Sequence, residues 1–313
     1  INTVPTQSGS LTYTGSAQSP TWNSYDPNAL QIGGTTTGTN AGTYQATFTP
    51  KDPYKWADGT TTAKTVNWTI GRAGITLPTQ SGSLTYTGAA QSPSWSGYDS
   101  NKMTLGGTTS GTNAGSYNAS FTPKANYQWT DGTTSAKTAA WSIGKAAGSL
   151  TLSKSSVSIG VSSKTDTVTV THPGDGAITA TSNNSAIATA SVSGTTITIT
   201  AKASGSTTIT VKVAAGTNYT APANKTINVT VQMLSPTLAN NTWAQIAAAS
   251  EAGVAASTWS VGDTKNITVG GETLTVEIVG FNHDDLASGG KAGITFGLKN
   301  LMANTRQMNS SNT

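Results

Sequence analysis

The first 146 residues of this chain are one sequence written twice, with an offset of 73 residues and no gap. A fixed period of this length indicates a tandem array of small modules rather than one enzyme core. Ile1 aligns with Gly74, so the first copy opens inside the module, and we expect a piece of a longer array or a processed product. The aromatic residues recur in register: Tyr13, Trp22, Tyr25, Tyr44, Phe48, Tyr54, Trp56 and Trp68 return as Tyr86, Trp95, Tyr98, Tyr117, Phe121, Tyr127, Trp129 and Trp141.

Low charge is the second constraint on the fold. Only 10% of the 313 residues are charged, which would permit disorder, but 8 Trp and 9 Tyr at repeating positions favour packed cores. The chain has no cysteine, so disulfides cannot staple these small modules. Together with abundant Ser, Thr and Asn, this favours a bacterial or phage exterior as the setting.

The charge distribution and hydropathy restrict the partners. The 17 basic and 13 acidic residues give a net charge of +4, and the basic residues are scattered along the chain. Nucleic-acid binding usually needs a basic stripe, so no nucleic-acid partner is predicted. The longest apolar stretches fall far short of the ~20 residues of a membrane span, so no membrane insertion is predicted.

Short strands broken by turns are predicted in the two repeats, residues 1–72 and 73–145, which we call module 1 and module 2. Residues 43–48 place Tyr44, Ala46 and Phe48 on one face of a strand. Asp58-Gly59 is a hairpin signal, and no amphipathic helix is visible. Short strands with Gly and Pro between them indicate a β-sandwich.

Residues 146–232, module 3, show a cleaner alternation of β-branched and polar residues. The apolar positions of four predicted strands are Val168 and Val170, then Ile197 and Ile199, then Ile209, Val211 and Val213, and finally Ile227, Val229 and Val231. Such period-2 patterns are typical of half-buried strands.

Three phrases of module 3 resemble the bacterial Ig-like (Big) family. They are Ser156-Val-Ser-Ile-Gly-Val, Ser182-Asn-Asn-Ser-Ala-Ile-Ala, and Ala201-Lys-Ala-Ser-Gly-Ser-Thr-Thr-Ile-Thr-Val. The aromatic residue that the family carries before the second phrase is absent, because Ile178-Thr-Ala-Thr stands there. The resemblance implies an Ig-like fold and leaves the function open, because such modules serve many surface proteins. Modules 1 and 2 resemble a more distant Ig-like surface repeat.

Residues 233–313, the tail segment, differ in composition. A helix is predicted over 241–253, with Asn241 or Thr242 as its cap, and a hairpin is predicted from 265–269 and 273–279. The segments Trp259–Lys265, Ile278–Asp285, Ile294–Gly297 and Met308–Thr313 resemble the first half of an uncharacterised domain of gut bacteria and their phages. The predicted fold class is mainly β, with tandem Ig-like β-sandwich modules in an elongated array and a small α+β C-terminal segment.

The best polar cluster for a metal or for acid–base chemistry is His283, Asp284 and Asp285. Metal sites usually need further ligands, and the only other histidine, His172, lies in module 3. Asn and Asp also favour turns, and a turn after the strand 273–279 is the preferred interpretation.

Four aromatic residues lie among Pro, Gly and Ser, in segments that could form loops: Trp22, Tyr25, Trp95 and Tyr98. Exposed rings stack on sugars, and repeated rings would add avidity, so these residues are the candidate ligand-binding set. Core filling is the alternative and the favoured interpretation, because a small module without disulfides needs large residues inside.

Lys64 and Lys137 recur at the repeat offset and are candidates for intramolecular Lys–Asn isopeptide bonds, which staple some bacterial surface sandwiches. Such bonds need a buried acid nearby. The recurring acids are Asp26 and Asp58 with their copies Asp99 and Asp131, and no apolar strand pattern flanks them.

No nucleophile elbow, phosphate loop or zinc spacing is present in the sequence, so neither an enzyme nor a cofactor is predicted. The expected role is a non-catalytic, surface-exposed structural or adhesive rod. A phage virion appendage that touches the host envelope comes first, a bacterial adhesin or envelope protein is the alternative, and the accessory region of a secreted glycanase is third. The expected partners are a cell-surface glycan or envelope component, other virion or surface proteins, and a second copy paired through edge strands such as 207–213.

Overall fold

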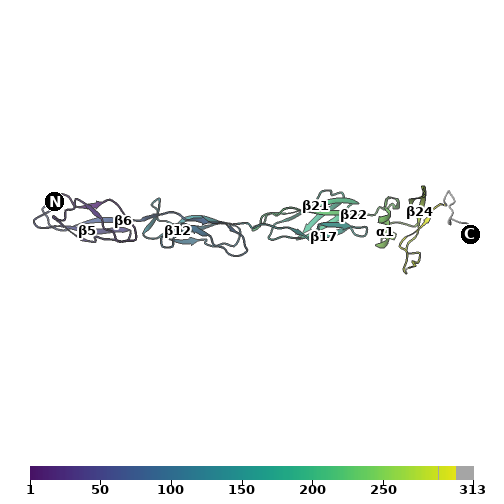
Figure 1. Cartoon of the computed structure of the whole chain (residues 1–313), viewed down its shortest axis with the longest axis horizontal. Helices are drawn as coiled ribbons and strands as arrows, with labels where there is room; N and C mark the ends of the chain where they lie inside the picture. The colour runs from purple at the N-terminus through teal and green to yellow at the C-terminus, as the bar shows by residue number, and fades with distance from the viewer. Residues whose placement is uncertain (288, 301–313) are drawn as a thin grey trace. The chain divides into compact units, whose positions relative to one another are not determined.

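The computed structural model describes residues 1–287 and 289–300, and the chain forms two compact units, Ile1–Ala146 and Ala147–Thr313. The fold is mainly β, as the sequence predicts, and α1 (Trp243–Glu251) is the one α-helix among the described residues. Figure 1 marks the main strands of each module and the position of α1.

Module 1 is built on one four-stranded sheet with the order β2-β6-β5-β4. The short β2 runs parallel to β6, and the other neighbours are antiparallel. A two-stranded ribbon, β1 with β3, forms a second small layer. The strand bounds are Thr6–Ser8 for β1, Leu11–Thr12 for β2, Thr21–Asn23 for β3, Leu30–Gly34 for β4, Gly42–Pro50 for β5 and Lys64–Gly71 for β6.

Module 2 repeats this arrangement with the sheet β11-β12-β14-β9 and the ribbon β8-β10. It adds a parallel pair, β7 with β13, at the end where the chain enters from module 1. The bounds are Ala73–Ile75 for β7, Thr79–Ser81 for β8, Leu84–Thr85 for β9, Ser94–Ser96 for β10, Met103–Gly107 for β11, Gly115–Pro123 for β12, Tyr127–Trp129 for β13 and Lys137–Gly144 for β14.

A buried aromatic group forms the core of each repeat. On β5, Ala46 and Phe48 are fully buried on the predicted face, and Trp68 of the adjacent β6 is fully buried as well. Tyr44 stacks on Trp68 with ring centroids 4.6 Å apart, and the Trp68 indole N–H donates to the Thr35 carbonyl at 2.7 Å. The same contacts recur in module 2 around Trp141.

Gly38 is required beneath this stack. Its position leaves no room for a Cβ atom against the Tyr44 ring, whose hydroxyl donates to the Asn40 carbonyl at 2.7 Å. Gly111 and Tyr117 repeat the arrangement in module 2. The Gly-Thr-Asn turn is therefore part of the core as well as a connection.

Module 3 is a sandwich of two four-stranded sheets, β15-β17-β20-β19 and β16-β22-β21-β18. The predicted alternation is confirmed, because the Val and Ile positions listed from sequence are all 5% exposed or less. The bounds are Thr151–Leu152 for β15, Ser156–Ile159 for β16, Thr165–Thr171 for β17, Ile178–Ser182 for β18, Ala188–Ser193 for β19, Thr196–Ala201 for β20, Gly205–Val213 for β21 and Lys225–Val231 for β22.

The prediction that residues 207–213 form an edge strand is wrong. They lie in β21, which pairs with β22 on one side and β18 on the other, so both of its backbone edges are occupied. The edges of this sheet are β16 and β18. Sequence alternation identifies the buried face of a strand but carries no signal for its place in the sheet.

The tail segment combines α1 with the sheet β23-β24-β25, and the predicted hairpin is present as β23 and β24. Thr242 caps α1, since its hydroxyl accepts from the Gln245 amide and the Gln245 side chain accepts from the Thr242 amide. Gly253 follows the helix with a φ of 68°, as expected for a C′ glycine. The bounds are Leu238–Asn240 for the 3-10 helix η1, Ala255–Ser257 for η2, Thr264–Val269 for β23, Glu272–Gly280 for β24 and Thr295–Leu298 for β25.

The helix buries Ile246 and Ala249, while Trp243 keeps 42% of its surface exposed and meets Phe296 edge-on at 5.3 Å. Val161 of module 3 packs against the same small core, so the tail segment rests on the end of that sandwich. The resemblance of residues 308–313 lies outside the described residues.

We predict that Phe48→Ala destabilises module 1 by about 3–5 kcal/mol, because it removes a fully buried ring from a small core. Phe121→Ala should lower the stability of module 2 by a similar amount, since its environment is the same. Calorimetry measures the loss of stability in both variants, and hydrogen exchange identifies the strands that are affected. A Phe48→Ala chain that unfolds like Thr43→Ala, an exposed neighbour on β5, would contradict this account.

Candidate functional site

The four candidate aromatic residues pack against the core. Trp22 meets Phe48 edge-on at 4.9 Å, and Tyr25 meets the same ring at 5.5 Å. Trp95 and Tyr98 meet Phe121 at 5.0 and 5.6 Å, and all four side chains are half-buried. The structure thus brings each pair together on one phenylalanine, an arrangement that fits core filling and leaves only part of each ring to solvent.

A glutamine that the sequence analysis missed holds this ribbon on the sheet. The Gln7 side chain donates to the Thr69 carbonyl at 3.0 Å and accepts from the Thr69 amide at 2.8 Å. Gln7 is also the residue that pairs with Trp22 across the ribbon. Gln80 makes the same two bonds to Ser142. Recurrence at the repeat offset was the only available signal.

Lys64 lies at the surface rather than beside a buried acid. Its ammonium is 2.9 Å from the Asp58 carboxylate and 5.0 Å from the centre of the Trp56 ring, and the lysine and aspartate side chains are 35% and 50% exposed. The Lys137–Asp131 pair repeats this at 2.5 Å over Trp129. Each lysine therefore closes the Asp-Gly turn as a solvent-facing ion pair.

The same loops perturb two carboxyl groups. The Thr60 hydroxyl and amide and the Lys64 ammonium hold the pKa of Asp58 far below its usual value of 3.8. In module 2 the Lys137 ammonium and then the Thr133 hydroxyl lower the pKa of Asp131 in the same way. Both carboxylates are hydrogen-bonded acceptors that fix the turn.

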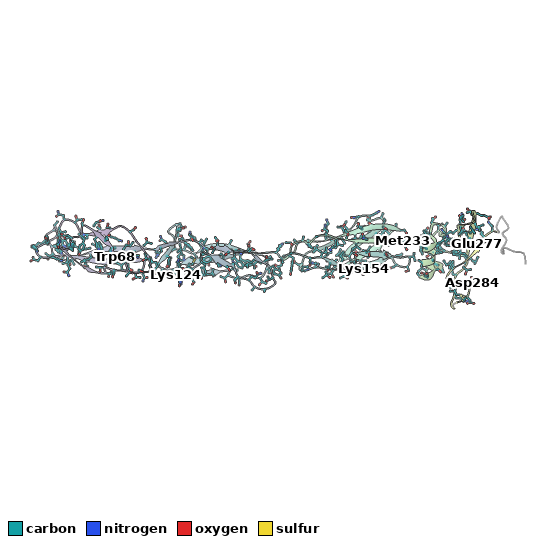
Figure 2. All side chains as sticks on the ribbon, viewed as in Figure 1. Trp68, Lys124, Lys154, Met233, Glu277 and Asp284 are labelled. Carbon is teal, nitrogen blue, oxygen red and sulfur yellow. The ribbon has the colours of Figure 1, made fainter. Side chains whose placement is uncertain are left out.

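The polar cluster of the tail segment lies on the loop between β24 and β25, where Figure 2 labels Asp284. His283 Nδ1 is 2.9 Å from Asp284 Oδ1, and the other Asp284 oxygen accepts from the Thr295 hydroxyl. The hydrogen bond from the Thr295 hydroxyl contributes most to lowering the pKa of Asp284 below its usual value, and the contact with His283 adds to it. Asp285 instead pairs with Lys291 at 2.6 Å.

The His283 and Asp284 side chains thus contact each other, whereas Asp285 pairs with Lys291, and the His283 side chain is 71% exposed. Within residues 1–287 and 289–300, no three His, Asp or Glu side chains are grouped closely enough to hold a metal ion. The positive φ of 49° at Asn282 marks a turn, which is the interpretation preferred from sequence.

Side chains lock the junction between the two repeats, which is the most specific polar arrangement in the first unit. Asn126 of module 2 accepts from the Ala41 amide at 2.9 Å and donates to the Asn40 side chain at 3.0 Å, both in module 1. Arg72 Nε donates to the Ala125 carbonyl at 2.9 Å. The Tyr13 and Tyr127 rings meet edge-on across the junction at 5.4 Å.

The linker contributes to the same lock. Only Arg72 separates β6 from β7, and the Ala73 amide donates to the Asn126 carbonyl at 2.9 Å. A hollow of about 290 Å³ lies at the junction and is lined by Gln128 from module 2 and by residues 41–43 and 69–72 of module 1. No local sequence pattern marks this junction.

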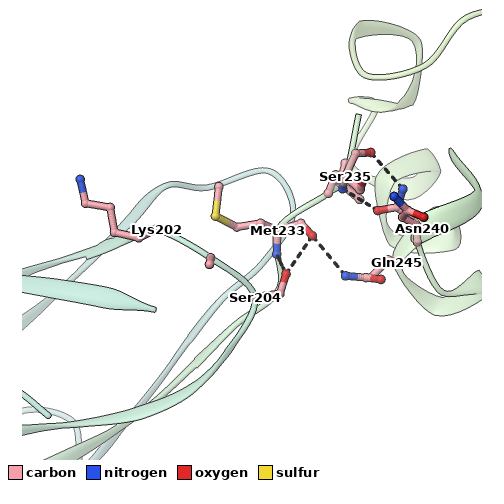
Figure 3. A pocket seen from close by; sticks show the side chains of 9 residues that line it. Lys202, Ser204, Met233, Ser235, Asn240 and Gln245 are labelled. Atoms are coloured by element: carbon pink, nitrogen blue, oxygen red, sulfur yellow. Dashed lines mark hydrogen bonds between the residues drawn. The ribbon is translucent and has the colours of Figure 1, made fainter. Parts of the chain in front are cut away.

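A second polar joint connects module 3 to the tail segment. A hollow of about 470 Å³ lies between the turn at Ser204 and the start of α1. Figure 3 shows side chains that line it, among them Ser204 and Gln245. Ser204 Oγ and Gln245 Nε2 both donate to the Met233 carbonyl, at 3.0 and 3.2 Å. Asn241, 2% exposed, bonds both the amide and the carbonyl of Ser235. These hydrogen bonds join module 3 to the tail segment.

No helix in the described part of the chain is long and apolar enough to cross a membrane.

Comparisons with known proteins complete the description. No family model and no curated protein matches the sequence. Among solved structures, domains 4 and 5 of the S-layer protein SbsC are 18% identical over 49% of this chain and 98% of theirs, with a TM-score of 0.25. Domains 1–6 of SbsC are 14% identical over 98% of this chain and 54% of theirs, with a TM-score of 0.28. The Escherichia coli adhesin FdeC is 13% identical over 73% and 96%, with a TM-score of 0.28. At these values the function has to be argued from the geometry of the chain itself.

We predict that Asn126→Ala weakens the coupling between the two repeats, because it removes two hydrogen bonds across the junction. The cost should be about 1–3 kcal/mol of coupling between the modules. Hydrogen exchange at Ala41 and residual dipolar couplings of the two modules provide the measurement. Asn118→Ala, an exposed change on β12, is the matched control, and equal coupling in both variants would contradict the role of Asn126.

The Asp58 loop gives a pH prediction. A folded-state pKa below 3.8 means that the carboxylate stabilises the loop above that pH and that this contribution is lost as the pH falls through the lowered pKa. Carboxyl-carbon NMR titration should therefore place the Asp58 midpoint well below 3.8. Thr60→Val or Lys64→Met should raise the midpoint, and Lys137→Met, which acts on Asp131, should leave it unchanged. A wild-type midpoint near 3.8 would refute the assignment.

Proposed function

We propose that this chain is a non-catalytic structural and adhesive protein of an exposed surface, in which the modules act as spacers for the tail segment. The observation that carries the proposal is the locked junction between modules 1 and 2. A spacer needs neighbouring modules that keep one orientation, and the one-residue linker with the Asn126, Arg72 and Tyr13 contacts supplies that constraint.

The use of charged residues supports a structural role. In the described residues, Lys–Asp pairs close local turns or bridge neighbouring segments, as with Lys64–Asp58 in module 1 and Lys154–Asp166 in module 3. Acid–base or nucleophilic catalysis needs such groups to converge on one site. The outward threonines of strands such as β17 support exposure to water, since every second residue of that strand faces solvent.

We place a phage virion appendage, extending from a tail or head surface toward the host envelope, ahead of a bacterial adhesin or envelope protein. The resemblance of the tail segment to a domain of gut bacteria and their phages supports this order. The Big-type assignment of module 3 is part of the proposal and fits both settings, because such modules serve as spacers on many particles and cells.

The proposed partners are an envelope component, such as a surface glycan, and other proteins of the same particle or cell surface. The exposed parts of Trp22, Tyr25, Trp95 and Tyr98 are candidate contacts for a glycan, although their packing on Phe48 and Phe121 limits the area that they offer. Self-association through a sheet edge of module 3 would use β16 or β18.

Location is the test. We expect antibody against module 3 to label gradient-purified phage particles from the source material, and washed cell envelopes serve as the comparison. Label on envelopes alone would replace the virion proposal with the bacterial one. Label on neither, with the protein recovered from the soluble cell interior, would overturn the surface role itself.

A further inference from the structure

The end of module 1 that lies away from module 2 carries the same loop that docks at the repeat junction. At the 73-residue offset, Asp52, Pro53 and Tyr54 correspond to Ala125, Asn126 and Tyr127. The same backbone hydrogen bond closes both loops, since the Tyr54 amide donates to the Lys51 carbonyl at 2.7 Å and the Tyr127 amide donates to the Lys124 carbonyl at 2.8 Å. The Asp52–Pro53 peptide bond of module 1 is cis, so the two loops share this hydrogen bond and differ in backbone conformation.

The two loops differ in what covers them. Tyr127 is half-buried because its ring meets Tyr13, whereas the Tyr54 ring is 45% exposed, one of the few large side chains left open in the described residues. An exposed tyrosine ring that no other aromatic ring covers is typical of an interaction surface.

We propose that the loop 52–54 is a docking surface for another module of this repeat, arriving on the N-terminal side of Ile1. The position of the chain supports that direction of approach. The Ile1 ammonium donates to the Lys55 carbonyl at 2.6 Å, so the chain enters module 1 beside this loop, as the linker enters module 2 with Ala73 bonded to Asn126. The incoming module would present a Tyr13-type ring to Tyr54 and an Arg72-type side chain to Asp52.

Three substitutions change the character of this junction. Asp52 replaces Ala125 and offers a carboxylate where Arg72 now bonds only a carbonyl oxygen. Pro53 replaces Asn126 and cannot make the two amide bonds to residues 40 and 41, and Lys55 replaces Gln128 in the lining of the hollow. The contact would therefore depend on the ring pair and the Arg–Asp52 pair and would weaken as salt screens the charges.

The test joins a second copy of residues 1–73, one full period of the repeat, in frame ahead of Ile1 of the full chain. Hydrogen exchange at the Tyr54 and Lys55 amides should slow by about tenfold and approach the protection of residues 127–128, which serve as an internal reference. Raising the salt concentration should reverse part of this protection.

Two variants of the fused protein distinguish docking from mere proximity. Tyr54→Ser in the original module 1 changes an exposed side chain, so the fold should persist while protection of Lys55 is lost. Arg72→Ala in the added copy should reduce protection and abolish its salt dependence. Unchanged exchange beside a folded added copy, or equal protection in all variants, would overturn the proposal. The inference goes beyond the proposed surface role, because it holds on a virion or a cell, and its failure would leave the location test unaffected.

Discussion

The stacked pair of Tyr44 and Trp68 is the interaction on which each repeat depends. A module of ~70 residues buries little of its surface and has no disulfide here, so few large side chains must supply the core. Trp68 is completely buried, and its indole N–H donates to the Thr35 carbonyl. The burial therefore leaves no indole donor without a hydrogen bond. Gly38 then has to be a glycine, because the Tyr44 ring occupies the space of its Cβ atom.

Module 3 reaches a packed core by a different route. Its two sheets have four strands each, so two full faces of Val and Ile meet, and no aromatic residue belongs to the buried cluster. Modules 1 and 2 oppose one sheet with a ribbon of three-residue strands. That ribbon presents few side chains, and large rings such as Trp22 compensate for the missing strands. The difference in composition between the modules thus follows from the number of strands in the second layer.

The same comparison shows what the sequence could reveal. Alternation over long strands predicts the buried faces of module 3, and Asn241 or Thr242 as a cap predicts the start of α1. A strand of three residues gives no usable alternation, so the orientation of Trp22 could not be derived from its neighbours in sequence. Gln7 bonds Thr69, and Asn126 bonds residues 40–41, so both act on residues that are distant in the sequence. No local sequence pattern marks such contacts.

A repeated sequence nevertheless contains information about contacts between modules, in the positions where its copies differ. Residues that both copies share, such as Tyr44 and Tyr117, serve the fold that both must reach. Among the residues at the junction between modules, Tyr13 and Tyr127 recur in both copies, whereas Asn126 does not. Asn126 bonds the loop of module 1, whereas Pro53 at the equivalent position has no polar side-chain atom that could do so. The divergence between Pro53 and Asn126 therefore accompanies a difference in what the loop can contact.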